Sequence, residues 1–310
     1  MNILITGGAG YIGSVLTPLL LQNDYKVTVI DNLMYKQNSL LDCFSFKNFT
    51  FIKSDVCNFD EINSLIPKFD IIIPLAAIVG APACKINPAL SKLINEDSNL
   101  NLVKNISKNQ QIIFPTTNSG YGIGEKNKYC DENSPLNPLS DYAKSKVKIE
   151  KLFLDNSNAT SLRLATVFGV SPRMRLDLLV NDFVFKAMKD NYLVLFEENF
   201  RRNYIHVFDV SNAFKFTLEN IKNMSGQIYN VGLSSANLTK LQLANKIKEH
   251  IPSLSIHSAK IGSDPDKRDY LVSNEKIEKI GWSAINSLDD GIQEIINSYE
   301  IIKMKANSNV

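Results

Sequence analysis

Tyr142 and Lys146, a phenol and an amine four residues apart, are the side chains in this sequence best suited to moving a proton. Residues 140–146 are predicted to begin a helix, with Ser140 or Asp141 as its N-terminal cap, so the two side chains lie one turn apart on one face. A phenol with a pKa of about 10 is a poor base at neutral pH, but an adjacent ammonium and an oxidised nicotinamide both favour the phenolate. The same spacing is common on exposed helix surfaces, so its meaning depends on the rest of the chain.

Thr117 carries a hydroxyl that could reach the same substrate oxygen. It follows the apolar run at residues 111–115, which is predicted to be a strand, and Thr116 is the neighbouring alternative. Because side chains alternate along a strand, Thr116 is expected to face the other way. Together Thr117 and Tyr142 suit the oxidation of an alcohol, in which Tyr142 moves the proton while a nicotinamide carries the hydride. Lys146 could in addition hydrogen-bond the nicotinamide ribose.

The hydride carrier has a candidate binding site at the start of the chain. There, an apolar strand at residues 3–5 leads directly into a glycine-rich turn and a helix. Glycines permit a sharp turn and let the backbone approach a pyrophosphate, so the ligand meets amide N–H groups at the helix N-terminus. Glycine clusters also form ordinary loops, but the order of strand, turn and helix favours a dinucleotide. The residues predicted to bind it here are Gly7, Gly10, Tyr11, Ile12 and Gly13.

Asp31 and Asn32 supply the second half of this fingerprint, about 20 residues further on, where the apolar run at residues 27–30 ends. A carboxylate here can accept hydrogen bonds from both ribose hydroxyls of the adenosine and would repel a 2′-phosphate, so NAD is favoured over NADP. Asp31 could otherwise be a turn residue or a helix cap. Lys36 is the main residue that could soften the preference for NAD.

Further apolar runs at residues 49–53, 70–74 and 111–115 alternate with segments of helical spacing, which predicts an α/β fold on a doubly wound parallel sheet. Ligands in such folds bind beyond the carboxyl ends of the strands, so the segments that follow the strands are candidate cofactor contacts. Asp55 could accept a hydrogen bond from the adenine amino group, although it could also cap the following helix. The contacts predicted in these segments are Asp55, Val56, Leu75, Ala76 and Ala77.

A smaller second lobe is predicted to begin after the strand at residues 161–168, where the patterning becomes mixed and less regular. No low-complexity linker marks the change, so the two lobes are expected to be interlocked. We therefore divide the chain into a NAD-binding domain at residues 1–166 and an α/β substrate lobe at residues 167–310. Some segments of the second part are expected to return to the first.

The composition excludes several other functions. With 310 residues, 44% of them hydrophobic, the chain can bury a large core, and its net charge of +2 gives no reason to expect nucleic acid or a membrane as a partner. The four cysteines form no C-x-x-C pair and the three histidines are scattered, so neither a disulfide framework nor a metal site is expected. No leader pattern precedes the first strand and no apolar run approaches the ~20 residues that span a bilayer, so we expect a cytoplasmic protein.

Taken together, these motifs resemble the extended short-chain dehydrogenases/reductases of the nucleotide-sugar epimerase and dehydratase group, and the similarity runs nearly end to end. The resemblance implies a Rossmann domain that binds NAD, and a homodimer formed through a four-helix bundle by helices around residues 89–107 and 140–155. It also places Asn95 at the position of a family asparagine near the active site. Besides the segments named above, the resemblance rests on residues 118–122, 202–210, 229–232 and 281–282.

The resemblance also implies how a nucleotide sugar is held. Arg202 and Arg268 match the family's phosphate-contacting arginines, which can fork onto phosphate oxygens, and Asn181 occupies a position that also meets the diphosphate. Arg173 and Arg175 could join them, although loop arginines are often simply solvated. The remaining predicted substrate contacts are Val79, Asn118 and Ser119.

The residues after Thr117 narrow the reaction. Relatives that remove water from a 4-keto sugar carry an acidic pair there, and those that epimerise C3 and C5 carry a cysteine two residues after the catalytic hydroxyl, whereas this chain has Asn118 and Ser119. An amide and a neutral hydroxyl are not competent to abstract a C–H proton, so both reactions are disfavoured. What remains is hydride chemistry at one carbon, most naturally C4.

Residues 75–82, 117–126 and 171–183 are especially similar to a branch of the family that acts on GDP-heptose in capsule polysaccharide biosynthesis. This resemblance implies oxidation of GDP-D-glycero-D-manno-heptose at C4 to its 4-keto form as the leading prediction. A 4-epimerase of a UDP- or GDP-sugar is the alternative, because the sequence separates net oxidation poorly from oxidation followed by re-reduction. A regulatory protein that binds NAD without turnover is a more remote alternative, against which the intact Thr117 and Tyr142 argue.

Overall fold

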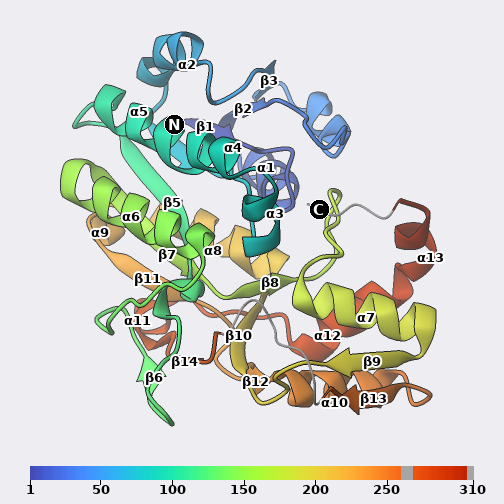
Figure 1. The fold of residues 1–310 in the computed structure, drawn as a ribbon. Helices are drawn as coiled ribbons and strands as arrows, with labels where there is room; N and C mark the ends of the chain where they lie inside the picture. The colour runs from blue at the N-terminus through green and yellow to red at the C-terminus, as the bar shows by residue number, and fades with distance from the viewer. Residues whose placement is uncertain (260–267, 306–310) are drawn as a thin grey trace.

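The fold is built on a central sheet of seven parallel strands. The computed structural model describes residues 1–259 and 268–305. The strands lie in the order β3, β2, β1, β4, β5, β7, β11, which confirms the predicted doubly wound α/β fold (Figure 1). Their bounds are β1 Asn2–Thr6, β2 Lys26–Asp31, β3 Phe49–Lys53, β4 Ile71–Pro74, β5 Gln111–Thr117, β7 Asn158–Leu164 and β11 Ile228–Val231.

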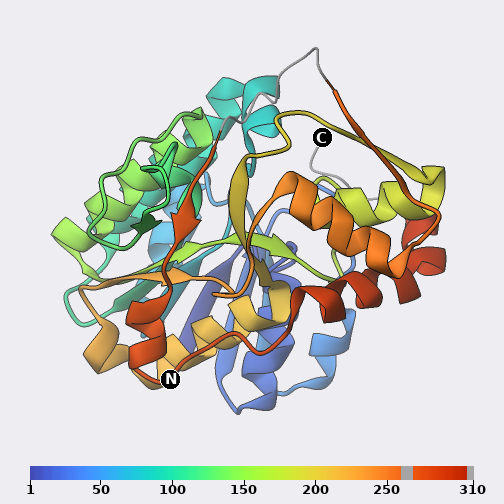
Figure 2. The ribbon, with the colours of Figure 1, turned by 90° about the horizontal axis from the view of Figure 1, so that it is seen from below.

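Alternating side chains bury both faces of this sheet. Ile3 and Ile5 pack in one cluster with residues of α1 (Gly13–Gln22) and α8 (Val207–Glu219), whereas Leu4 packs in another with residues of α2 (Phe59–Leu65), α5 (Ser98–Asn105) and α6 (Asp141–Asn156). Figure 2 shows the sheet between the two helical layers. Continuous apolar strands are stable only when both faces are covered in this way, so the carboxyl ends of the strands are left as the accessible edge.

The predicted single strand at residues 161–168 is two strands in two different sheets. β7 ends at Leu164 and belongs to the central sheet, whereas β8 (Thr166–Phe168) pairs in parallel with β10 (Arg201–His206). β10 in turn pairs antiparallel with β12 (Asn237–Thr239). Residues 161–168 contain neither glycine nor proline, so no sequence signal marks the break at Ala165. The predicted domain boundary, between residues 166 and 167, falls inside β8.

The second lobe has its own apolar core, formed by α7 (Leu179–Asp190), α10 (Lys240–His250) and α12 (Leu288–Asn297) with β9 (Tyr192–Leu195) and β13 (Ser255–Ser258). Figure 1 shows these elements grouped beside the central sheet. The chain then returns to the first lobe, because α8 packs in the core on one face of the central sheet and β11 is a strand of that sheet. The smaller elements are α3 (Ala81–Ile86), α4 (Pro88–Lys92), a π-helix (Leu93–Asp97), β6 (Tyr129–Cys130), α9 (Ile221–Met224), β14 (Leu271–Val272), α11 (Glu275–Lys279) and α13 (Tyr299–Ile302). Within residues 1–259 and 268–305, no helix is long and apolar enough to cross a membrane.

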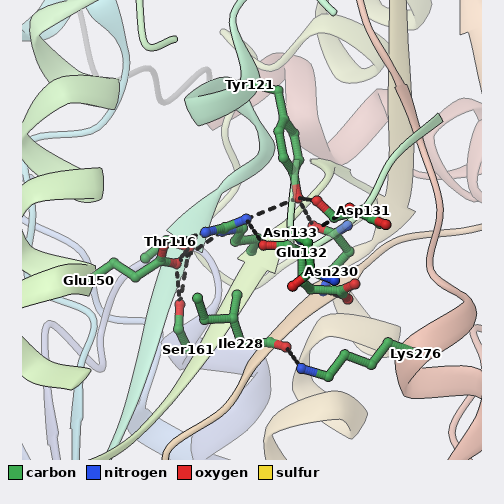
Figure 3. A network of polar contacts seen from close by, with 11 residues as sticks. Thr116, Tyr121, Asp131, Glu132, Asn133, Glu150, Ser161, Ile228, Asn230 and Lys276 are labelled. Carbon is green, nitrogen blue, oxygen red and sulfur yellow. Dashed lines mark hydrogen bonds and ion pairs between the residues drawn. The ribbon is translucent and has the colours of Figure 1, made fainter. Parts of the chain in front are cut away.

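A buried ion pair fixes α6 against the sheet. Glu150 on α6 and Arg163 on β7 are joined at 2.7 Å between Oε1 and Nη2, and their side chains are only 4% and 5% exposed. Thr116 and Ser161 each donate a hydroxyl hydrogen bond to Glu150 Oε2, at 2.9 and 2.5 Å. Arg163 also donates to the Tyr121 hydroxyl at 3.1 Å, so the network extends towards β11 (Figure 3). Because Glu150 lies one turn beyond Lys146 on α6, this network holds that part of α6 in place.

Candidate functional site

A cavity of about 600 Å³ lies at the carboxyl ends of the central strands, and residues of both lobes line it. The structure brings nearly all the predicted cofactor residues to its wall. Those that line it are Gly7, Gly10, Tyr11, Ile12, Gly13, Asp31, Asn32, Asp55, Val56, Leu75, Ala76 and Ala77.

The glycine-rich turn leaves room for a ligand where side chains would fill it. Gly7 has φ +71°, and a Cβ there would lie 2.6 Å from the Ala76 backbone. A Cβ on Gly13 would lie 2.5 Å from the Gly8 backbone, so glycine is needed at both positions for the turn to pack. A Cβ on Gly10 would meet only the Gly7 carbonyl, at 3.1 Å, and Gly10 lines the cavity. The turn therefore fits a dinucleotide diphosphate placed at the N-terminus of α1.

Asp31 is held at the end of β2 with its carboxylate at the cavity. Its Oδ2 accepts from Ala9 N at 3.0 Å and its Oδ1 accepts from Leu33 N at 2.8 Å, which ties it to the glycine-rich turn. Burial raises the pKa of Asp31, and the two backbone donors oppose that rise. Asp55 is not the N-cap of α2, because Asn58 occupies that position. Asp55 Oδ2 instead accepts a hydrogen bond from Asn32 Nδ2 at 2.8 Å.

Asn95 does not line the cavity, but it orients a segment that does. It lies on the π-helix and is 3% exposed. Its Oδ1 accepts from Ile78 N at 2.8 Å and its Nδ2 donates to Ile78 O at 2.9 Å. Asn95 thus fixes the backbone next to Ala76 and Ala77, the small residues that we predict to contact NAD. Its role is to position that segment.

Thr117, Tyr142 and Lys146 line this same cavity, from the end of β5 and the first turns of α6. Ser140, and not Asp141, caps the helix, accepting from Ala143 N at 3.2 Å. Thr116 turns its hydroxyl away to Glu150, as strand alternation predicts. The arrangement therefore offers one hydroxyl, one phenol and one amine to a single ligand.

Burial dominates the electrostatics of the catalytic pair. It raises the pKa of Tyr142 to about 12, with opposing contributions from Arg175 and Arg268. It lowers the pKa of Lys146 to about 8, and the Lys146 amine donates to Pro115 O at 3.0 Å. From the sequence we expected Lys146 to lower the pKa of Tyr142. In the structure the charges that oppose the rise in this pKa are those of Arg175 and Arg268. The positive charge of an oxidised nicotinamide is the further factor that would favour the phenolate.

The buried amine makes stability depend on pH in a defined window. Unfolded, Lys146 binds its proton up to its ordinary pKa of 10.5, whereas the folded protein releases it at about 8. The unfolded state thus binds more protons between these values, so the free energy of unfolding should rise as pH increases from 8 to 10.5. We expect Lys146→Met to remove that part of the rise and to be more stable than the wild type at pH 7. Urea unfolding at a series of pH values measures both; identical pH profiles for the two proteins would contradict the prediction.

Ser119 and Arg268 orient the Thr117 hydroxyl. Arg268 donates to Ser119 Oγ, and Ser119 Oγ lies 2.8 Å from Thr117 Oγ1. Thr117 Oγ1 also accepts from Ser119 N at 3.1 Å. Because an arginine can only donate, Ser119 Oγ accepts from Arg268, and either hydroxyl can be the donor in the contact between Ser119 and Thr117. The structure thus connects Arg268 to Thr117 through the Ser119 hydroxyl.

The other predicted substrate residues divide into two groups. Asn181 is fully buried away from the cavity: it accepts from Gly169 N and donates to Arg175 O and the Tyr11 hydroxyl, so it braces the joint between the lobes. Asn118 is 1% exposed and does not line the cavity either, and its amide has no hydrogen-bond partner among the described residues. The predicted substrate residues that do line the cavity are Val79, Ser119, Arg173, Arg175, Arg202 and Arg268.

Among the large side chains on the cavity wall that sequence reasoning missed are Tyr35, Lys240 and Tyr270. Lys240 is the first residue of α10, where Thr239 and Gln242 form a capping box, so a search for helix starts could have found it. Tyr35 and Tyr270 lie in irregular segments without a sequence signal. Within the described parts of the chain, no three potential metal ligands gather.

The chain matches a known protein family and resembles characterised proteins over nearly its whole length. The sequence profile described as "NAD dependent epimerase/dehydratase family" matches residues 3–232. A trifunctional UDP-glucose 4,6-dehydratase, epimerase and reductase of Arabidopsis thaliana is 27% identical over 96% of this chain, which spans about half of that protein, 47%. A putative UDP-glucose 4-epimerase of Methanocaldococcus jannaschii is 28% identical, covering 95% of this chain and 97% of that protein. The crystal structure of a Bacillus cereus UDP-glucuronic acid 4-epimerase, in complex with UDP-glucuronic acid and NAD, is 26% identical with a TM-score of 0.85, covering 98% of this chain and 99% of the other.

Proposed function

Because this chain belongs to the NAD dependent epimerase/dehydratase family, and so uses NAD, we propose that it oxidises C4 of a nucleotide sugar in the cytoplasm. One observation carries the proposal: Thr117, Tyr142 and Lys146 line one cavity with the glycine-rich turn, and no carboxylate follows Thr117 at positions 118 and 119. This set can move a proton at an alcohol oxygen but offers no base for a neighbouring C–H bond.

Each of the three residues has a distinct task at the reacting alcohol. Tyr142 removes the proton from the sugar hydroxyl, and Thr117, held by Ser119, hydrogen-bonds the same oxygen. Lys146 is held by its hydrogen bond to Pro115 O, and its amine would hydrogen-bond the nicotinamide ribose when NAD is bound. NAD, when bound, supplies the acceptor for the hydride that leaves the carbon.

We propose GDP-D-glycero-D-manno-heptose as the first substrate to test, on the basis of the sequence resemblance alone. The cavity supports a nucleoside diphosphate in general, because Arg202, Lys240 and Arg268 bring positive charge to one wall. Forked guanidinium contacts with phosphate oxygens are the strongest contacts available there. The sequence does not distinguish guanine from uracil in chemical terms.

A nucleotide-sugar 4-epimerase is the second candidate. Relatives named as 4-epimerases match this chain over nearly its whole length, including one whose structure has a TM-score of 0.85. The same residues serve both reactions, since a 4-epimerase returns the hydride to the other face of the sugar. The two differ only in whether reduced cofactor leaves or reacts again.

Incubation with a panel of nucleotide sugars separates the candidates. The panel should include GDP-D-glycero-D-manno-heptose, UDP-glucose and UDP-glucuronic acid, with products resolved by mass spectrometry and NMR. Oxidation gives a product lighter by two hydrogens together with NADH, whereas epimerisation gives an unchanged mass with C4 inverted. A product lighter by one water would contradict both and indicate a dehydratase.

We also propose that two copies associate through the helices around residues 89–107 and 140–155, as the family resemblance implies. Lys148 on α6 donates to Glu96 on the π-helix, so these two segments already lie against each other on the surface. Leu93, which is 37% exposed, lies on the same π-helix. Light scattering after size exclusion tests the dimer, and Leu93→Arg should shift it to a monomer.

A further inference from the structure

We propose that Arg173 and Tyr35 form a clamp over the cofactor groove, in which the Arg173 guanidinium serves the diphosphate and adenosine ribose of NAD and not the substrate. The sequence alone groups Arg173 with the substrate contacts. The inference rests on the NAD binding that the proposed function requires, but not on the identity of the sugar.

The two side chains meet across the lobes. The Arg173 guanidinium lies 4.4 Å from the centre of the Tyr35 ring, within the range of a cation–π contact. Arg173 comes from the loop between β8 and α7, whereas Tyr35 follows Asp31 and β2 in the first lobe. Arg173, Tyr35 and Asp31 all line the cavity. The contact thus joins the two lobes at the end of the cavity where Asp31 is expected to receive the ribose.

The loop that carries Arg173 is attached to the glycine-rich turn. The Tyr11 hydroxyl donates to Gly169 O at 2.7 Å, and Ser171 Oγ donates to Tyr11 O at 2.7 Å. Ser14 Oγ lies 2.9 Å from Ser171 Oγ. Two anchor points within four residues of Arg173 therefore hold the loop beside the turn that receives the diphosphate. This fixes which end of the cavity the guanidinium occupies.

The charge of Arg173 lies close to Asp31, in the part of the cavity predicted to bind the cofactor. The side chain is 2% exposed, and it lowers the pKa of Asp31, which burial raises. Arg173 Nη1 donates to Met174 O at 2.8 Å. A guanidinium carries its N–H donors in one plane, so it can bind a phosphate oxygen at its edge while its face stays on the Tyr35 ring. A diphosphate seated on the glycine-rich turn would lie beside the loop that carries Arg173.

Arg175, two residues further on, has a different partner. Its Nη2 pairs with Asp177 Oδ2 at 2.6 Å. Its charge lowers the pKa of both Tyr142 and Tyr35, so it lies within electrostatic reach of both parts of the cavity. Arg175 is therefore a comparison variant from the same loop, whose guanidinium is already paired with a carboxylate.

The test compares the affinities of the full chain for cofactor and nucleotide after bound NAD has been removed. Calorimetry with NAD, ADP-ribose, GDP and UDP should be run on the wild type, Arg173→Met and Arg175→Met, and stopped-flow should give the NAD dissociation rate. We expect Arg173→Met to weaken NAD and ADP-ribose alike by about tenfold or more, with faster dissociation, while GDP and UDP keep their affinities. Arg175→Met should weaken ADP-ribose binding less than Arg173→Met does, because the Arg175 guanidinium is paired with Asp177.

Tyr35 supplies the second arm of the test. Tyr35→Phe preserves the ring and should bind NAD as the wild type does, whereas Tyr35→Leu should release it several-fold faster. Arg173→Lys, which keeps the charge without the planar face, should fall between Arg173→Met and the wild type and covers the case in which Arg173→Met fails to fold. Unchanged NAD affinity in Arg173→Met, or a loss confined to GDP or UDP, would overturn the proposal. Because no step requires turnover, either result is distinguishable from a failure of the proposed reaction.

Discussion

Replacing Tyr142 by Phe should reduce turnover by about 10²- to 10⁴-fold while leaving NAD binding nearly unchanged, because the variant loses only the group that accepts the substrate proton. The phenyl ring keeps the packing of Tyr142 against Ile78, Ala83, Cys84 and Ile94. Steady-state rates with the active nucleotide sugar, together with calorimetry for NAD, measure the two effects separately.

The matched control for this change is Tyr129→Phe. Tyr129 lies on the short strand β6, is 55% exposed and does not line the cavity, so the loss of its hydroxyl should have no measurable effect on turnover. A Tyr142→Phe protein with full turnover would contradict the assignment of Tyr142 as the proton acceptor. A protein that loses both turnover and NAD affinity would indicate that the phenol acts mainly in cofactor binding.

Removing one partner of the buried pair Glu150 and Arg163 should lower the free energy of unfolding by about 3–5 kcal/mol, because the remaining charge stays buried without its partner. Glu150 has four contacts to lose, from Thr116, Ser161 and two nitrogens of Arg163. Urea unfolding of Arg163→Met and Glu150→Gln measures the loss.

The surface pair Lys128 and Glu125 is the control for that measurement. Its side chains are 65% and 70% exposed, so Glu125→Gln should change stability by less than about 1 kcal/mol. A loss of similar size at the surface pair and the buried pair would contradict the account. The double variant Glu150→Gln with Arg163→Met should be less destabilised than the sum of the two single changes, since it leaves no unpaired charge.

The cofactor-binding residues, together with Tyr142 and Lys146, could be predicted from the sequence because their positions are set by local structure. The turn at Gly7 to Gly13 requires glycine for backbone reasons, Asp31 follows a strand at a fixed distance, and the spacing of Tyr142 and Lys146 sets them on one helix face. In each case the strand or helix that carries the residue also sets the direction of its side chain. The parallel sheet then brings these separate segments to one edge.

The positions of the substrate-binding residues could not be predicted in the same way, because contacts between distant segments place their side chains. Asn181 is turned into the joint between the lobes by Tyr11 and Gly169, and Arg268 reaches Ser119 across 149 residues of sequence. The switch from β7 to β8 between two sheets falls at Ala165, where no glycine or proline marks it. Motif spacing predicts that such residues take part in substrate binding. Their positions in the cavity depend on the packing of distant segments and cannot be predicted from spacing.

The central claim, hydride removal from C4 with Tyr142 as the base, is tested most directly by a substrate carrying deuterium at C4. A single turnover of the full chain with excess enzyme should be quenched, and the cofactor and sugar analysed by mass spectrometry. The account predicts deuterium on the nicotinamide ring, released with the reduced cofactor in a dehydrogenase or returned to C4 in an epimerase, and a far slower transfer in Tyr142→Phe. Product formed with its deuterium exchanged into water, or with the cofactor unlabelled throughout the turnover, would contradict it.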